Sequence, residues 1–574
     1  MVMSHPAQPL AVIHLAGTQA QMGRQHGEIQ RALGGHQPAL DYYRQMPLMM
    51  LRGSQPHGIL RTLPTALAPV IEGLTRRLEA DRPEALRQRT QAFVQALGLP
   101  AAEARQVLVM DVFQNLVGVA GRVGVVQGAR PLLSQAIAAC STLVAWGNAT
   151  ANGSLLHARN FDFPGPGIWD AAPTVVMCSP DNGLRYGFAS TRGGDAPVVS
   201  LWNEAGLCLT THTRLHRDVR FSGGAIIDIC HDVIRQASTL AEAEALIRRR
   251  PPASTWGIVV SSAREQSAIL VETTARNLQV TRPQPTATSL ASTNHYLAVQ
   301  LQPGELAPNS GYTAHSHGRL HRMERAVAEG RARGGLTAQD LQSLLGDHHD
   351  AYQPDLERAA GGVLAQPTGV HSIVIDPGAE VSYVSTGMAP AGRGPYLAVP
   401  WKWSTFAGFE CHAPAESVQP PGAESLYTKG LTAQAYSHFL DAVAAESLGA
   451  EPAVTATHIV RAVQCDPSES TWQLLHAGFQ MRTGQFDSAL AALEQGIAHE
   501  QSPFYLGRLL LWASRLLDLR DRSLAARQVR DRLALLKDPL LGPLQRQADA
   551  DKRHTWTRAK LRHVPIQVFM GAVG

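Results

Sequence analysis

The central part of the chain, from Cys140 to about Trp403, consists of short apolar runs that Gly, Asn, Asp and Pro residues separate. Runs such as TVVMCS, TWGIVVSS and GVHSIVID have the length of β-strands, and the breaks between them carry turn-forming residues. Two helical patterns interrupt the strands, GGAIIDICHDVIRQASTLAEAEALIRR and HSHGRLHRMERAVAEGRARGGLTAQDLQSLLGD. This order predicts an α+β domain whose sheets carry helices on their outer faces.

The segments on both sides of this region have a different pattern of apolar residues. Residues 1 to about 135 carry apolar residues at spacings of three and four and are predicted to be mainly helical. The Pro- and Ala-rich segment 412–425 reads as a linker, and the chain is again helical from there to about residue 550. The 574 residues are enough for two or three domains.

The C-terminal helices resemble a repeat. In AGFQMRTGQFDSALAALEQGI, four residues are placed as in a tetratricopeptide-like helical hairpin: Gly484, Phe486, Ala489 and Leu490. SPFYLGRLLLWASRLLDL with SLAARQVRDRLALL is a candidate second pair, and no clean third unit is visible. Two interpretations stay open, a helical appendage that covers its own core and a docking surface for a protein partner.

Charge and composition exclude several classes of function. The 51 Lys and Arg residues are scattered among 47 acidic residues, without a basic run, which predicts no nucleic-acid and no membrane partner. No window of roughly eighteen uncharged apolar residues occurs, and MVMSHPAQPLAVIHLAG lacks the pattern of a signal peptide, so we expect a soluble, cytoplasmic protein. Its six cysteines are widely spaced without a CxxC pair, so we expect free thiols, one of which could be a nucleophile.

The first of these cysteines heads a predicted hairpin. STLVAWGN and SLLHARNFDF alternate like strands, with ATANG as the turn. With a loop over residues 149–153, Asn148 pairs with Ser154 and Cys140 lies opposite Asp162, with Cβ atoms about 4.5 to 5.5 Å apart. Arg159 then falls on the other face of the sheet, unless the strand bulges.

A thiol beside a carboxylate is poorly activated inside a chain, because the negative charge disfavours the thiolate. The arrangement makes chemical sense if Cys140 becomes a chain terminus. Its new α-amino group, with a pKa of roughly 7.7 to 8, could accept the thiol proton, Asp162 could orient the ammonium, and Arg159 could offset the acid. The alternative is that Cys140 is a small buried apolar residue, as many cysteines are.

Six segments resemble one family in the same order. CSTLVAWGNATANGSLLHARNFDF resembles the start of the mature chain in the choloylglycine hydrolase and isopenicillin N acyltransferase-like group of N-terminal nucleophile (Ntn) hydrolases, in which the second strand ends in R-N-x-D. The other five segments are GTQAQMGRQHG, WNEAGLCLTTHT, STNHYL, SHGRLHRMERA, and GVHSIVIDP followed by VSYVSTGMAP. Together they cover about residues 12–405.

This resemblance implies an αββα sandwich, two stacked antiparallel sheets between helical layers. It also implies autocatalytic cleavage between Ala139 and Cys140. The expected units are a helical propeptide or small subunit (1–139), the Ntn core (140–411), the linker (412–425) and the helical tetratricopeptide-like region (426–574).

The resemblance assigns a role to each site residue. It makes Cys140 the nucleophile, with its own α-amino group as base, and Asn294 the oxyanion donor. Asp162 and Arg159 are the orienting residues, and Arg319 matches the arginine of the family's helix, with Arg322 as a competitor. The turn after Cys140 is longer than in the bile-salt enzymes, and His212 and Thr213 stand where some relatives have a second Asn.

The implied reaction is cleavage of a linear amide C–N bond through an acyl-enzyme on Cys140. Alternatives are transfer of the acyl group to an amine and, from another class, a non-catalytic platform that uses its C-terminal helices. The expected substrate is a small amide or acyl compound, and no cofactor is implied. His212, Thr213, Phe163 and Trp202 are candidate substrate contacts, although aromatic residues at such positions are more often ordinary packing.

One further motif, GDHHDAY, contains chemically suitable metal ligands in His348, His349 and Asp350. Adjacent histidines diverge on a helix or a strand, and no third ligand motif accompanies them. We therefore predict no metal site.

Overall fold

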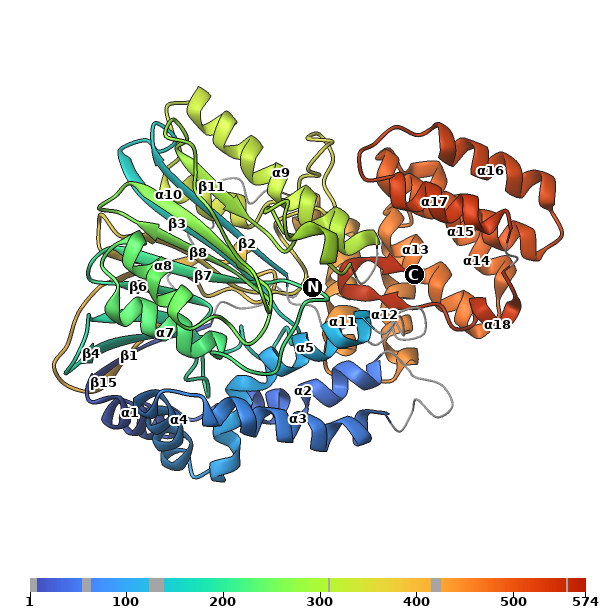
Figure 1. Ribbon diagram of the computed structural model, residues 1–574. Helices are drawn as coiled ribbons and strands as arrows, with labels where there is room; N and C mark the ends of the chain where they lie inside the picture. Colours follow the sequence, from blue (N-terminus) through green and yellow to red (C-terminus); the bar gives the residue numbers. More distant parts are fainter. Residues whose placement is uncertain (1–7, 54–62, 123–138, 308–309, 414–424, 554–555) are drawn as a thin grey trace.

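The computed structural model describes residues 8–53, 63–122, 139–307, 310–413, 425–553 and 556–574, and its centre is a pair of stacked sheets (Figure 1). The larger, nine-stranded sheet has the order β10-β9-β8-β7-β6-β5-β4-β1-β15. Its strands are β1 (Leu10–Gly17), β4 (Pro173–Pro180), β5 (Tyr186–Thr191), β6 (Ser200–Asn203), β7 (Leu207–Thr213), β8 (Trp256–Ser262), β9 (Ser267–Thr273), β10 (Leu278–Thr281) and β15 (Gly408–His412).

The second, six-stranded sheet has the order β11-β2-β3-β12-β13-β14. Its strands are β2 (Ala139–Gly147), β3 (Gly153–Asp162), β11 (Ser289–Ser292), β12 (Gly369–Asp376), β13 (Val381–Ser385) and β14 (Tyr396–Pro400). Apolar side chains of the two sheets, such as Val175 and Ile373, share one buried cluster, so the inner faces pack on each other.

Helices cover both outer faces. Residues of α7 (Ile226–Gln236) and α8 (Leu240–Arg249) pack on the larger sheet, and residues of α9 (Ser310–Ala332) and α10 (Ala338–Leu345) pack on the smaller one. Two short turns of 3-10 helix are η3 (Gln302–Gly304) and η4 (Ala391–Arg393). The predicted αββα sandwich is confirmed, with one parallel pair, β1 and β4, in otherwise antiparallel sheets. Within the described ranges, no helix is long and apolar enough to cross a membrane.

The N-terminal region is less purely helical than predicted. Its elements are β1, α1 (Gln19–Leu33), α2 (Gln37–Gly53), α3 (Leu63–Ala80), α4 (Glu84–Ala96), η2 (Ala101–Leu108) and α5 (Val109–Arg122). The short run LAVIHLAG is a fully inserted strand, β1, which lies between β4 and β15. The region that precedes Cys140 therefore contributes a strand to the core sheet, and residues 123–138 lie outside the described part of the chain.

The glycines of the GTQAQMGRQHG segment explain how α1 and α4 pack. A Cβ atom on Gly23 would lie 2.1 Å from the carbonyl oxygen of Arg89, and one on Gly27 would lie 2.5 Å from that of Phe93. Only glycine permits such a close approach of two helix backbones. The motif therefore fixes α4, and with it Arg89, against the core.

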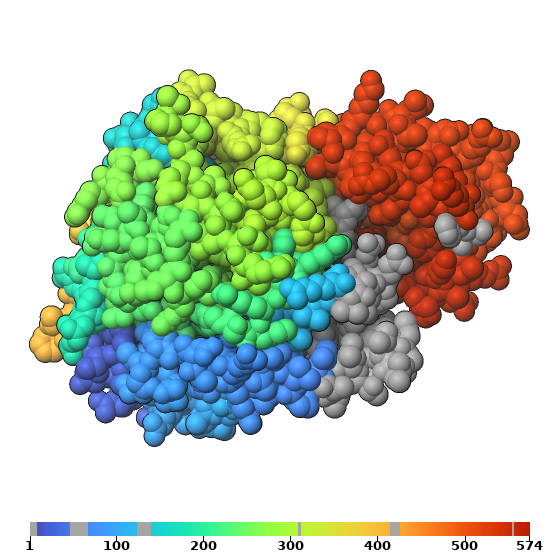
Figure 2. All heavy atoms as spheres, in the orientation of Figure 1, coloured from blue at the N-terminus to red at the C-terminus, as the bar shows by residue number. Residues whose placement is uncertain are grey.

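The C-terminal helices form a lobe beside the core (Figure 2). Their elements are η5 (Leu426–Thr428), α11 (Gly430–Ser447), α12 (Pro452–Cys465), α13 (Ser470–Thr483), α14 (Phe486–His499), α15 (Pro503–Leu519), α16 (Ser523–Leu535), α17 (Gly542–Asp551), α18 (Arg558–Leu561), β16 (Ile566–Gln567), η6 (Val568–Met570) and β17 (Ala572–Val573). The two predicted hairpins are α13–α14 and α15–α16, and α11–α12 is a further pair that the sequence did not reveal. Most of the predicted linker, 414–424, is outside the described residues.

Buried ion pairs fasten the N-terminal helices to the core. The Arg89 guanidinium of α4 donates to both carboxylate oxygens of Asp195, at 2.7 and 2.9 Å, and His26 Nδ1 lies 3.1 Å from the same carboxylate. Arg82 forms a similar buried pair with Asp228, at 2.8 Å. Burial raises the pKa of Asp195, but the charge of Arg89 outweighs that effect and the pKa lies below its ordinary value.

We expect Asp195→Asn to lower the free energy of unfolding by about 3–5 kcal/mol, because it leaves the buried Arg89 without its counter-charge. Urea unfolding of the full chain measures the change. The matched control is Glu204→Gln, which breaks the half-exposed pair with Arg185 and should cost less than about 1 kcal/mol. Equal effects of the two substitutions would contradict the role of the buried pair.

Candidate active site

The β2–β3 hairpin brings Cys140 to the inner face of the smaller sheet, with a register one residue away from the predicted one. Cys140 lies opposite Phe161, and Ala139 lies opposite Asp162. The prediction that Cys140 faces Asp162 directly is therefore wrong. Because side chains alternate between faces, the shift places Arg159 on the face of the thiol and Asp162 on the other.

The turn accounts for this difference. The strands close at Gly147 opposite Gly153, instead of the predicted pair of Asn148 with Ser154. An irregularity between Ala145 and Gly147 then shifts the register by one residue. Apolar alternation alone does not reveal such a bulge, because the extra residue is absorbed without a break in the pattern.

Arg159 is the direct partner of the thiol. Its Nη2 lies 3.1 Å from Cys140 Sγ, and its Nη1 donates to the Thr211 carbonyl oxygen at 2.6 Å. Both side chains are buried. Burial raises the pKa of the Cys140 thiol, and the charge of Arg159 partly offsets this. The same burial lowers the pKa of Arg159.

A second buried guanidinium, that of Arg319 in α9, connects the remaining predicted residues. Arg319 donates to the Cys140 carbonyl oxygen at 2.6 Å and to Asn294 Oδ1 at 2.8 Å. Asn294 Oδ1 also accepts the Cys140 N–H at 2.9 Å, and Asn294 Nδ2 donates to the Thr213 carbonyl oxygen at 3.3 Å. Arg322, the competing arginine, instead pairs with Asp347 at 2.5 Å. The backbone of Cys140 is thus held by Asn294 and Arg319 together.

Asp162 is buried beside these groups, and few interactions offset the cost of burying its charge. Its Oδ2 lies 3.8 Å from Arg319 Nη1, and neither carboxylate oxygen has a hydrogen-bond partner in the part of the chain that the structure describes. Burial raises its pKa to about 6, against the charges of Arg319 and Arg159. The carboxylate can therefore accept a further positive group.

An apolar cavity of about 210 Å³ opens at Cys140. Cys140, Arg159, Phe163 and Thr213 line it, as does Trp169. Helices that precede Cys140 supply other wall residues, which sequence analysis missed: Tyr43, Val94, Val107 and Met110. Their apolar spacing looks like ordinary helix packing, so no sequence signal separated them from core residues.

Two of the four predicted substrate contacts lie elsewhere. Trp202 is fully buried between the sheets, where it stacks on Trp401 with a ring separation of 6.1 Å. His212 is buried behind the site, and its Nε2 lies 2.9 Å from Thr142 Oγ1 and 3.4 Å from Arg159 Nη1. Neither residue lines the cavity. Trp202 and His212 therefore do not fit a substrate in this cavity, whereas Thr213 and Phe163 line it.

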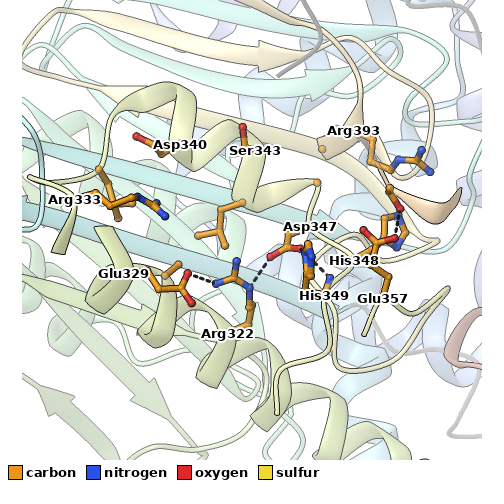
Figure 3. A pocket seen from close by; sticks show the side chains of 16 residues that line it. Arg322, Glu329, Arg333, Asp340, Ser343, Asp347, His348, His349, Glu357 and Arg393 are labelled. Atoms are coloured by element: carbon orange, nitrogen blue, oxygen red, sulfur yellow. Dashed lines mark hydrogen bonds and ion pairs between the residues drawn. The ribbon is translucent and has the colours of Figure 1, made fainter. Parts of the chain in front are cut away.

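The GDHHDAY motif lies at a second pocket, of about 200 Å³, beside α9 and α10 (Figure 3). His349 Nδ1 lies 2.5 Å from Asp347 Oδ1, while His348 Nδ1 lies 2.8 Å from the Arg358 carbonyl oxygen. Asp350 pairs with the side chain of Arg358. The three candidate ligands therefore have separate partners and do not converge on one point.

Residues 151–384 match the family model of Acyl-coenzyme A:6-aminopenicillanic acid acyl-transferase. The matched segment contains Arg159, Asp162, Asn294 and Arg319, and it begins after Cys140. The match confirms the resemblance to the Ntn acyltransferase-like group, and it indicates an acyltransferase or hydrolase kind of activity. No curated protein matches the chain.

We expect Arg159→Gln to raise the pKa of the Cys140 thiol by about 1 to 3 units, because an opposite charge within contact distance favours the thiolate by that amount. The rate at which iodoacetamide alkylates the Cys140 peptide, followed by mass spectrometry over a range of pH, measures the shift. Arg192→Gln is the control, since Arg192 hydrogen-bonds to the Gly34 carbonyl oxygen instead. An unchanged profile in Arg159→Gln would contradict the contact.

Proposed function

We propose, from the match of residues 151–384 to this family, that the chain is an autocatalytically processed cysteine amidase. Cleavage would separate residues 1–139 from residues 140–574 and leave Cys140 as the N-terminal nucleophile of an Ntn core. The observation that carries the proposal is the convergence of Arg159, Asn294 and Arg319 on Cys140 at the wall of an apolar cavity.

In the processing step, Cys140 Sγ attacks the carbonyl carbon of Ala139. The peptide C–N bond breaks, the acyl group moves from nitrogen to sulfur, and the thiol proton passes to the departing nitrogen. Water then hydrolyses the thioester and frees the Ala139 carboxyl group. The hydrogen bond from the Cys140 N–H to Asn294 Oδ1, at 2.9 Å, supports this step because it holds the scissile amide in place.

In turnover, the new α-amino group of Cys140 serves as the base. Its ordinary pKa of roughly 7.7 to 8 suits it to take the thiol proton near neutral pH. The thiolate attacks the substrate's amide carbonyl, and Asn294 with a backbone N–H stabilises the oxyanion. The α-ammonium protonates the leaving amine, and water releases the acid from the acyl-enzyme. Asp162 orients the ammonium group.

The cavity indicates the part of the substrate that is bound. Its wall is mainly apolar and aromatic, with residues such as Phe163 and Trp169, and its volume is about 210 Å³. Pockets for whole drug-sized ligands span roughly 300–1,000 Å³. The cavity therefore suits an aliphatic or aryl acyl group, with the amine side of the amide outside it.

Acyl transfer is the second candidate, because the matching family is described as an acyl-transferase. The same acyl-enzyme serves both reactions, and the outcome depends on whether water or an amine reaches the thioester. Coenzyme A thioesters are then candidate acyl donors.

We expect the wild-type chain to give two masses in a denaturing spectrum, 1–139 and 140–574, and Cys140→Ala to give one uncut mass, because alanine offers no nucleophile. Cys140→Ser is the matched variant, since its hydroxyl keeps a weaker nucleophile at the same atom position. Normal cleavage of Cys140→Ala would contradict the assignment. An uncut wild-type chain without amidase activity would favour a non-catalytic platform.

We expect hydrolysis to dominate when N-acyl amides with apolar acyl groups are supplied to the processed enzyme. Chromatography of the products with and without a competing primary amine measures the partition. Free acid as the main product at all amine concentrations supports the amidase. An N-acylated amine as the main product, with the same total rate of acyl release, would assign the enzyme to the transferases.

A further inference from the structure

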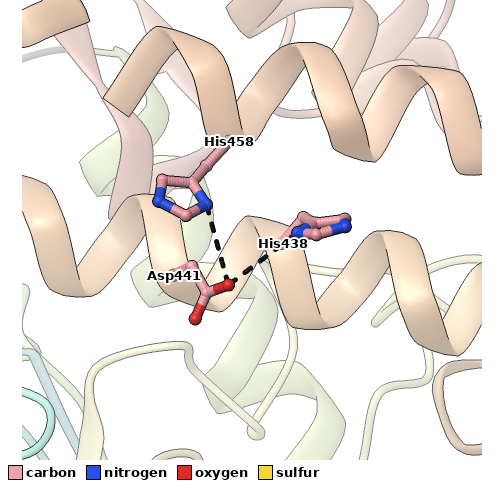
Figure 4. Close-up of side chains that lie close together, drawn as sticks. All are labelled: His438, Asp441 and His458. Atoms are coloured by element: carbon pink, nitrogen blue, oxygen red, sulfur yellow. Dashed lines mark ion pairs between the residues drawn. The ribbon is translucent and has the colours of Figure 1, made fainter. Parts of the chain in front are cut away.

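Two histidines and an aspartate meet between the first two helices of the C-terminal lobe (Figure 4). His438 and Asp441 project from one face of α11, three residues apart, and His458 faces them from α12. One ligand atom from each of the three side chains lies within 4.8 Å of the others. The two helices thus bring three metal-ligating side chains to one point.

These groups do not form a hydrogen-bond network. His458 Nδ1 lies 3.6 Å and His438 Nδ1 lies 3.8 Å from the same oxygen, Oδ2 of Asp441. Both distances exceed the 2.7 to 3.2 Å that is usual for a hydrogen bond from nitrogen to oxygen. Both Nδ1 atoms are buried and have no hydrogen-bond partner among the described residues. Two unsatisfied nitrogen atoms therefore face one carboxylate oxygen across a gap.

A metal ion explains that spacing. Zinc binds histidine nitrogen and carboxylate oxygen at about 2.0 to 2.2 Å, so tetrahedral ligands lie about 3.3 to 3.6 Å apart. The separations of 3.6 and 3.8 Å from Asp441 Oδ2 are close to that range. We propose that His438, Asp441 and His458 bind a divalent zinc ion, with water as the fourth ligand.

The site is accessible to an ion from solution. The side chains of His438, Asp441 and His458 are exposed by 30%, 39% and 23%. Partial exposure leaves room for the water ligand, while the buried Nδ1 atoms give the donors a fixed direction.

The position of α11 gives the ion a structural consequence. Near the end of this helix, Glu446 accepts the backbone N–H groups of Val568 and Phe569, and the Ser447 carbonyl oxygen accepts the Tyr42 hydroxyl at 3.3 Å. The helix thus contacts both the C-terminal segment and the N-terminal α2. Zinc joins α11 to α12 and stabilises the hairpin that makes these contacts, independently of the proposed amidase activity.

The test uses the full-length protein, stripped with a chelator and dialysed, and zinc chloride as the probe. Competition with a chromophoric chelator should give one zinc ion per chain. His458→Gln and His438→Gln should each weaken binding by at least about 100-fold, since loss of even an outer-shell partner of a metal ligand costs 10- to 100-fold. His499→Gln, an exposed histidine on α14, is the control and should bind as the wild type does.

Thermal unfolding and cobalt substitution provide readouts that do not depend on catalysis. Zinc should raise the melting temperature of the wild type and of His499→Gln, and of neither ligand variant. Cobalt(II) should give the visible absorption of a tetrahedral site in the wild type and in His499→Gln, and in neither ligand variant. Absence of stoichiometric zinc binding would overturn the proposal. The proposal would also fail if the two ligand variants changed only the pH dependence of unfolding without metal. That result would identify the cluster as a histidine–aspartate ion pair.

Discussion

Two buried guanidinium groups dominate the electrostatics of the candidate active site. Arg159 and Arg319 are both inaccessible to solvent, and Asp162 is the carboxylate near them. Such burial is costly for folding, because charges removed from water need good partners. Here the partners are the thiol sulfur, backbone carbonyl oxygens and Asn294. The resulting excess of positive charge favours the negative species of the proposed reaction, a thiolate and an oxyanion. The apolar packing of the surrounding sandwich offsets the free-energy cost of burying these charges.

The segment before Cys140 is built into that sandwich. Strand β1 lies inside the larger sheet, Arg89 is paired with Asp195 in the core, and Met110 lines the cavity. Under the proposed function, cleavage after Ala139 would therefore break one covalent bond without removing the fragment. Asp195 belongs to both features, because it pairs with Arg89 and also lines the cavity. Under the same proposal, the segment before Cys140 would therefore contribute to the wall of the acyl pocket.

The sequence predicted the parts that local chemistry determines. Turn residues and apolar alternation identified the strands of the central region, and the motifs led to Cys140, Asn294 and Arg319, which the fold brings together. It failed where the outcome depends on tertiary contacts. The strand LAVIHLAG directly precedes a helix and was not distinguished from the helical region around it. The irregularity near Ala145 places Asp162 on the face of the sheet opposite to the Cys140 thiol, instead of the predicted same face. His438 and His458 come together only because two helices pack against each other, which sequence spacing does not show. The adjacent histidines of GDHHDAY are visible as a motif in the sequence, but each has a separate partner in the structure.

The observed register of the β2–β3 hairpin bears on how the proposed nucleophile, Cys140, would be activated. With Asp162 directly beside the thiol, its charge would have opposed the thiolate at close range. The observed register separates the positive group from the negative one. Arg159 faces the sulfur, and Asp162 lies one position away along the ladder, opposite Ala139. In the uncut chain, both oxygens of Asp162 are buried without a hydrogen-bond donor in the described part of the protein, and burial raises its pKa to about 6. An ammonium group formed at Cys140 by the proposed cleavage would supply a hydrogen-bond donor to this carboxylate, in addition to the nearby charge of Arg319, and would lower that pKa. The proposed cleavage would therefore create the hydrogen-bond donor that the buried carboxylate of Asp162 lacks in the uncut chain.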